Sequence, residues 1–179
     1  MTDYKIWDPV VRLFHWSLVV LFTANALILD DDGAAHEWVG YAIVALVCPR
    51  LVWGFVGPHS ARFAAFLPGP GAITEQISDI ATHRCRAHLG HSPLGALMVV
   101  NLLAVMLGIG ATGYMMTTDA FRGIDWVEDL HEILVTWAEI SVVLHVAAVI
   151  FESRRTGINL PRAMVTGTKR VPHDIRIVE

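Results

Sequence analysis

The sequence has little charge, and this shortage narrows the class of protein. Asp, Glu, Lys and Arg make up 17% of the 179 residues, whereas hydrophobic residues make up 54%. Soluble domains carry about 25% charged residues on average, so this composition favours a membrane protein. The net charge is −4, and no nucleic-acid partner is expected.

Cysteine is also scarce, with two residues in the chain. Cys48 lies inside an apolar run and Cys85 lies in a connection that we expect to be cytoplasmic, so neither indicates a disulfide. The sequence contains no Cys-x-x-Cys-His motif, which excludes the covalent attachment of a c-type haem. Any haem in this protein would be held by ligation and packing.

Long apolar runs are abundant instead. Four of them predict helices at roughly 13–29, 37–56, 94–116 and 133–151. About 20 apolar residues in a helix cross the hydrocarbon core of a bilayer. The sequence therefore predicts an all-α integral membrane protein, a four-helix bundle that forms a single domain over residues 1–179.

The charges between the runs predict the orientation of the bundle. Basic residues precede the first run, separate the second from the third and follow the fourth: Lys5, Arg12, Arg62, Arg84, Arg86, Arg154, Arg155, Arg162, Lys169, Arg170 and Arg176. The other two connections hold seven carboxylates against one arginine, Arg122: Asp30, Asp31, Asp32, Asp119, Asp125, Glu128 and Asp129. Because positive charge concentrates on the cytoplasmic side, both termini and the central connection are expected there.

The central connection, 57–92, is too long for a bare loop. Ile73, Ile77 and Ile80 recur at helical spacing opposite polar residues, which predicts a short amphipathic helix on the membrane surface or a partner. The histidines that follow lack the spacing of metal ligands and are expected to face mostly solvent: His83, His88 and His91.

Two histidines share one face of the fourth predicted helix. His131 and His145 are fourteen residues apart, with the small Ala138 midway. Fourteen residues rise by about 21 Å in an α-helix and return to nearly the same face. One helix therefore presents two imidazoles at two depths of the membrane.

Two further histidines match those depths. The first helix runs from inside to outside, so His15 is at the inner level, and the second runs back, so His36 is at the outer level. The fourth helix brings His131 to the outer level and His145 to the inner level. The predicted pairs are His15–His145 and His36–His131.

Two nitrogens at each level favour haem iron as the bound metal. Zinc and copper normally need three or four converging protein ligands. A porphyrin supplies four nitrogens, so two imidazoles complete the iron, and the absence of an open position favours electron transfer. The alternative is a helical membrane protein whose histidines serve structure or a proton relay, which explains no particular pairing.

Three other residues are candidate haem contacts. Arg12 lies three residues before His15 on the same face, where its guanidinium could hold a propionate or simply anchor the helix. Arg50 lies inside an apolar run and needs an anionic partner, such as a propionate, an Asp side chain or a lipid phosphate. Gly40, one turn after His36, leaves clearance for a flat group or allows close helix packing.

Several short motifs together resemble the prokaryotic dihaem b-type cytochromes, the bacterial cytochrome b561 family, which includes the b-type cytochrome subunits of nickel–iron hydrogenases. The resemblance covers nearly the whole chain, and its motifs are Arg12-Leu-Phe-His15-Trp16, His36-Glu-Trp-Val-Gly40-Tyr41, Arg50-Leu-Val-Trp53-Gly54, Gly90-His91-Ser-Pro-Leu-Gly95, Leu130-His131-Glu132, Leu144-His145 and the stretch from Asn159 to Arg170. This chain is shorter than the usual hydrogenase subunits.

The resemblance implies two non-covalent haem b groups, ligated by His15, His36, His131 and His145, in a bacterial inner membrane. It also implies electron exchange between the quinone pool of a respiratory chain and a redox partner, either a dehydrogenase or a soluble cytochrome. His59 and His91 stand where the family often has polar residues near the inner haem, which makes them candidates for a quinone pocket or for support of the haem.

The family also implies a competing function. Some members are self-sufficient membrane superoxide:quinone oxidoreductases, which would make the chain an enzyme rather than an electron-transfer subunit. Superoxide is an anion, whereas the outer connections hold seven carboxylates and only Arg122, so electrostatics ranks this function lower. A non-redox helical scaffold is a third hypothesis.

Overall fold

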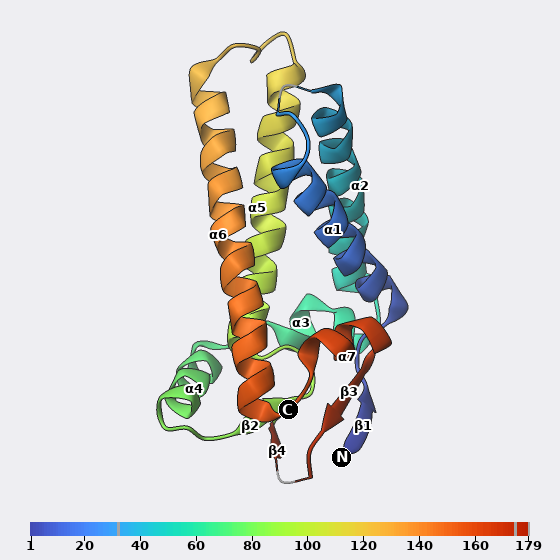
Figure 1. Ribbon diagram of the computed structural model, residues 1–179, viewed down its shortest axis with the longest axis vertical. Helices are drawn as coiled ribbons and strands as arrows, with labels where there is room; N and C mark the ends of the chain where they lie inside the picture. Colours follow the sequence, from blue (N-terminus) through green and yellow to red (C-terminus); the bar gives the residue numbers. More distant parts are fainter. Residues whose placement is uncertain (32, 174, 179) are drawn as a thin grey trace.

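A computed structural model describes residues 1–31, 33–173 and 175–178; Asp32, one of the acidic residues expected outside, is not among them. Four long helices dominate it: α1 (Pro9–Leu27), α2 (Ala34–Val56), α5 (Pro93–Thr117) and α6 (Asp125–Thr156) (Figure 1). All four are long and apolar enough to cross a membrane. The prediction of a mainly helical protein with four candidate membrane-spanning helices is confirmed, although the structure also contains four short strands.

All four long helices begin before the expected residues, and the shift is largest in α1 and α6, where polar residues start the helix. The Asp8 carboxylate accepts hydrogen bonds from the amides of Val10 (2.9 Å) and Val11 (3.1 Å), so α1 begins at Pro9 rather than near residue 13. Helix α6 begins at Asp125 rather than near residue 133, with acidic side chains in its first turn. These carboxylates complement the positive end of the helix dipole, so the acidic segment forms the beginning of α6 instead of a loop.

The helices pack in the order α1, α2, α5, α6, and the contact between α5 and α6 is the most extensive of these. The apolar core between them centres on Val47, Leu103, Met106 and Ala138. Gly110 permits the contact of α5 with α2, since a Cβ there would lie 2.3 Å from a methyl group of Val44. Packing of α1 against α6 is not among the main helix contacts, so the bundle is most loosely closed between these two helices.

A polar contact joins α5 and α6 near mid-span. The Asn101 side-chain amide donates to Ser141 Oγ at 2.9 Å, and the Trp137 indole donates to Asn101 Oδ1 at 3.0 Å. Hydrogen bonds between membrane helices satisfy polar groups that lipid cannot, so this contact fixes the register of the two helices.

The ends of the chain and the central connection fold together into a cap at one end of the bundle (Figure 1). We call this the capped end, and the end with the α1–α2 and α5–α6 connections the far end. The cap consists of β1 (Thr2–Lys5), η1 (His59–Ala61), α3 (Phe63–Phe66), α4 (Pro70–Ala81), β2 (Arg86–His88), α7 (Leu160–Thr166), β3 (Thr168–Val171) and β4 (Arg176–Val178). The amphipathic segment around Ile73–Ile80 is α4.

Two small sheets connect the cap to the chain termini. Strand β1 pairs antiparallel with β3, and β2 pairs parallel with β4. The sequence analysis did not predict these strands, because they are short and their pairing partners are distant in the sequence. The basic segment after α6 is therefore a structured part of the cap.

A buried ion pair attaches α4 to β2. Arg86 donates to both carboxylate oxygens of Asp79, at 2.6 and 2.7 Å, and lies 2.7 Å from Glu75. Hydrogen bonding from Arg86 holds the pKa of Asp79 below its usual value. Next to this pair, the buried Gln76 side chain accepts a hydrogen bond from the Leu94 amide in the first turn of α5, which anchors α4 to the bundle.

We expect Asp79→Asn to lower the thermal unfolding midpoint of the purified protein at pH 7. Because the pKa of Asp79 is lowered in the folded state, its stabilisation is complete above the pKa of the unfolded chain and is lost as pH falls through the folded-state pKa. The difference between variant and wild type should therefore shrink towards acid pH. A difference that stayed constant with pH would contradict this role of the ion pair.

Gly167 is required where α7 turns into β3. Its φ is +83°, and a Cβ there would lie 2.9 Å from the Trp7 carbonyl oxygen. Left-handed backbone costs a β-branched residue about 1–3 kcal/mol, so Gly167→Val should lower the unfolding midpoint. Gly71→Val in α4, where the space around a Cβ is open, is the matched control; equal effects of the two substitutions would contradict the requirement.

Candidate haem sites

The first histidine pair lies towards the capped end. His15 comes from α1 and His145 from α6, and their ring centroids are 6.4 Å apart with an interplanar angle of 56°. This pair therefore bridges the two helices that are most loosely packed. We call it the capped-end site.

The second pair lies towards the far end. His36, in the first turn of α2, faces His131 of α6 with ring centroids 6.5 Å apart and an interplanar angle of 63°. We call it the far-end site. The structure thus brings together the same two pairs that matching depths predicts.

The spacing of the rings fits a metal ion between them. A bond from a metal to an imidazole nitrogen is about 2.0 Å, and the nitrogen lies about 1 Å from its ring centre, so two imidazoles on opposite sides of one ion have centres about 6 Å apart. Both pairs have this spacing. Among the described residues, no group of three or more His, Cys, Asp or Glu side chains could hold a metal ion. An ion at either pair would therefore need further ligands, such as the nitrogens of a porphyrin.

The hydrogen bonding of His131 leaves the correct nitrogen available. Its Nδ1 lies 2.9 Å from Thr112 Oγ1, and that hydroxyl also lies 2.9 Å from the Gly108 carbonyl oxygen. A hydroxyl has one proton, which it donates to the carbonyl, so it accepts the proton of Nδ1. The neutral ring then carries its lone pair on Nε2, as a metal ligand requires.

The other rings have less support from the protein. The Nδ1 atoms of His15 and His36 are buried and have no hydrogen-bond partner within the described part of the chain. Asp31 lies 3.9 Å from Nδ1 of His36, beyond hydrogen-bond distance. No atom lies within 4 Å of a Cβ built on Gly40, one turn after His36, so there is open space beside the far-end site.

Two arginines near the capped end have unsatisfied nitrogens. Arg50 is 4% exposed; its only hydrogen bond, to the Ala61 carbonyl, is long at 3.4 Å, and its Nη1 has no partner within the described residues. Arg12 donates to the Val165 carbonyl, and its buried Nε likewise has no partner there. Guanidinium groups that have buried, unpaired nitrogens and contact no described carboxylate fit an anionic ligand, and the propionates of a haem have that chemistry.

His91 and His59 have different surroundings. The half-buried His91 ring lies 4.7 Å from Trp7 and 4.3 Å from Phe66, and its Nδ1 is buried. Burial, with a smaller contribution from the charge of Lys169, lowers the pKa of His91 to about 3. The expectation that His91 faces mostly solvent is therefore wrong, because the cap folds over it. His59 is exposed in η1 and does not join this cluster.

The sequence analysis did not single out two charged residues that the structure makes conspicuous. Lys169 is 3% exposed in β3. Glu139 is exposed near the middle of α6, between the two histidines of that helix. Glu139 could have been found from the sequence, because it is a charged residue within the apolar run 133–151. No local sequence pattern indicates that Lys169 is buried.

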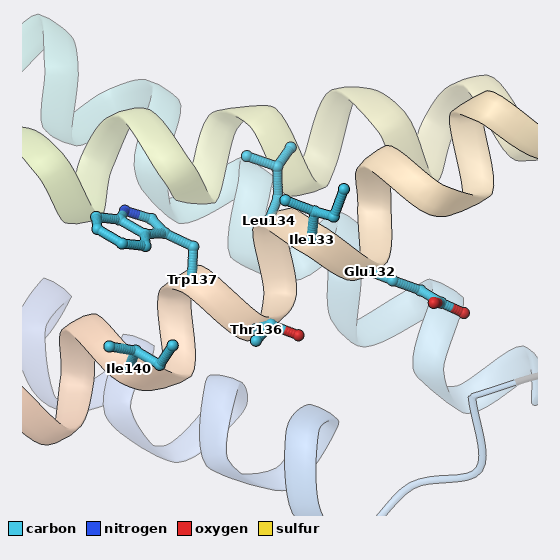
Figure 2. A pocket seen from close by; sticks show the side chains of 6 residues that line it. All are labelled: Glu132, Ile133, Leu134, Thr136, Trp137 and Ile140. Carbon is cyan, nitrogen blue, oxygen red and sulfur yellow. The ribbon is translucent and has the colours of Figure 1, made fainter.

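A shallow groove of about 430 Å³ lies elsewhere, on α6 between the two levels (Figure 2). It is lined by Glu132, Ile133, Leu134, Thr136, Trp137 and Ile140, and Trp137 points towards α5. None of the four paired histidines lines it, so the groove is separate from both candidate sites.

Comparison with known proteins decides the family. The model of the prokaryotic cytochrome b561 family matches residues 6–167. The chain belongs to this family. The protein is therefore a multi-pass membrane cytochrome of b type that transfers electrons through haem. Searches among curated proteins and among solved structures found no match.

The bond between Thr112 and His131 gives the cytochrome a testable feature. Thr112→Val keeps the volume but leaves Nδ1 of His131 without its partner, and loss of such a partner typically weakens metal binding 10–100-fold. We expect haem at the far-end site to dissociate more readily, measured by haem transfer to an excess of an apo-haem-binding protein. Thr136→Val, on the exposed side of α6, is the control; equal losses in the two variants would contradict the role of Thr112.

Proposed function

We propose that this cytochrome carries two haem b groups, one between His15 and His145 and one between His36 and His131, and moves electrons across the membrane. The observation that carries the proposal is the matched geometry of the two imidazole pairs, with centroids 6.4 and 6.5 Å apart at two levels of one bundle. A haem held by two imidazoles would supply one-electron transfer.

The protein positions the ligands through α6. Its two histidines differ by fourteen residues, so the rigid helix sets the separation of the sites at about 21 Å along its axis. Thr112 orients the His131 ring, and Arg12 and Arg50, whose buried nitrogens have no described partner, would bind propionates at the capped end. The proposed group at the capped-end site would fill the loosely packed boundary between α1 and α6.

We further propose that the capped end is cytoplasmic, in a bacterial inner membrane, and that quinone exchanges electrons there. The basic residues of the cap and the acidic far end support this orientation. His91, held between aromatic rings, is the quinone-pocket candidate that the structure supports, whereas the exposed His59 has no such support. A dehydrogenase or soluble cytochrome would exchange electrons at the far end.

The superoxide:quinone oxidoreductase remains the competing function, and the far-end charge disfavours it. Arg122 is the one basic residue in the far-end connections, and it lies 3.8 Å from Asp119. An anionic substrate would therefore approach a negatively charged surface. Rapid haem reduction when superoxide is added to the purified protein alone would favour the enzyme over the electron-transfer subunit.

The test of the two sites is haem quantitation with a reduced-minus-oxidised spectrum. We expect two b haems in the wild type, loss of only the far-end haem in His131→Ala, and loss of only the capped-end haem in His145→Ala, because each substitution removes one ligand. His83→Ala, an exposed histidine of the cap, should keep both haems. A wild type without haem, or histidine variants that keep both haems, would refute the proposal.

A further inference from the structure

Lys169 is a buried cation that contacts no carboxylate among the described residues. Its ammonium group donates to the carbonyl oxygens of His88 at 2.8 Å and Gly90 at 3.1 Å, and lies 5.9 Å from the centre of the Trp7 ring. Burial lowers its pKa to about 8, so the group remains mostly protonated at neutral pH. Glu152, which acts on it from α6, is already bound to Arg155 at 2.7 and 2.9 Å.

Lys169 belongs to a group of cations at the capped end. The charges of Lys169 and Arg50 both act on the His91 imidazole, and His145 of the capped-end site also lies near this ring. Arg12 contacts the same region, since its guanidinium lies 3.0 Å from a Cβ built on Gly167. Three cations with mainly carbonyl partners therefore lie at the end of the bundle that carries the His15–His145 pair.

A second acidic group near these cations is, like Glu152, committed to other partners. Asp8 acts on Arg50, but its side chain caps α1 by accepting from two backbone amides. Lys169, Arg50 and the half-buried Arg12 therefore carry positive charge at the capped end that no described carboxylate neutralises by direct contact.

The far-end site has the opposite surroundings. Asp31 lies 3.9 Å from the His36 ring, Glu37 follows in the same turn of α2, and Glu132 follows His131 in α6. Glu37 accepts a hydrogen bond from Tyr41 at 2.8 Å and has no basic partner among the described residues. The two sites of one bundle thus have electrostatic surroundings of opposite sign.

We propose that Lys169, together with Arg12 and Arg50, makes the capped-end haem the more easily reduced of the two, so that an electron entering the bundle settles at the capped end. The inference rests on the proposed function. Reduction adds one negative charge to a site; nearby cations stabilise that charge, and nearby carboxylates destabilise it. The far-end carboxylates therefore lower the reduction potential of that haem, while the capped-end cations raise the potential of the other.

Glu139 does not reverse this order. It lies eight residues from His131 and six from His145, about 12 and 9 Å along the helix axis. Its charge therefore acts on both sites to a similar extent, whereas the cations of the cap and the carboxylates near His36 each act mainly on one.

The order can be measured by a spectroelectrochemical titration of the holoprotein. We expect two one-electron steps, with the capped-end haem reduced first and favoured at least tenfold at equilibrium, which corresponds to about 59 mV. Titrations of His36→Ala, which keeps the capped-end haem, and His15→Ala, which keeps the far-end haem, assign the steps.

Charge variants then test the cause. Lys169→Gln should lower the potential of the capped-end haem and leave that of the far-end haem unchanged, and Asp31→Asn should raise only the far-end potential. Arg170→Gln is the matched control, because this neighbour in β3 is exposed and paired with Asp3 at 3.2 Å. Its removal should shift neither potential.

The outcomes separate this inference from the proposed function. A protein with two haems whose far-end haem is reduced first, or a Lys169→Gln shift no larger than that of Arg170→Gln, overturns the inference alone. A wild type without haem overturns both. If Lys169→Gln does not fold, the order of the two steps in the wild type still decides.

Discussion

The geometry of α6 is the constraint on which the rest of the molecule depends. One helix carries a histidine of each pair, so the separation and relative direction of the two sites follow from helical rise and period. The partner histidines come from two different helices, α1 and α2, and their depths must match those of α6. The contact of α5 with α6, with its Asn101–Ser141 hydrogen bond, holds α6 in register without contributing a paired histidine.

The cap supplies what a bundle of four apolar helices cannot. Ions are costly in lipid, so basic side chains near a haem at the end of a bundle need support from polar structure outside the membrane. Here β3 positions Lys169 against carbonyls of the segment that precedes α5, and α7 supplies the carbonyl that Arg12 binds. The ion pair of Asp79 with Arg86 then ties α4 to the same structure.

The opposite charges at the two ends of the bundle bear on both its orientation in the membrane and the surroundings of the two candidate sites. The distribution that predicts the orientation in the membrane also gives the two candidate histidine pairs different electrostatic surroundings. In the proposed function both pairs would ligate haem in the same way, so the surroundings would be the means of distinguishing the two sites. An asymmetric distribution of charge could therefore serve insertion and electron transfer at once.

The sequence alone was enough for the four apolar helices, the mainly helical class and the pairing of the histidines, because hydropathy and helical periodicity are local properties that lipid enforces. The sequence was insufficient for the start of α6, where an acidic segment that was expected to be a loop forms the first turns of the helix, and for the structure of the cap. The burial of His91 and Lys169 depends on the pairing of β1 with β3 and of β2 with β4. Each pairing joins residues that are more than 80 positions apart in the chain. Only the tertiary structure decided these features, since short strands and buried ions gain their stability from partners that no local pattern identifies.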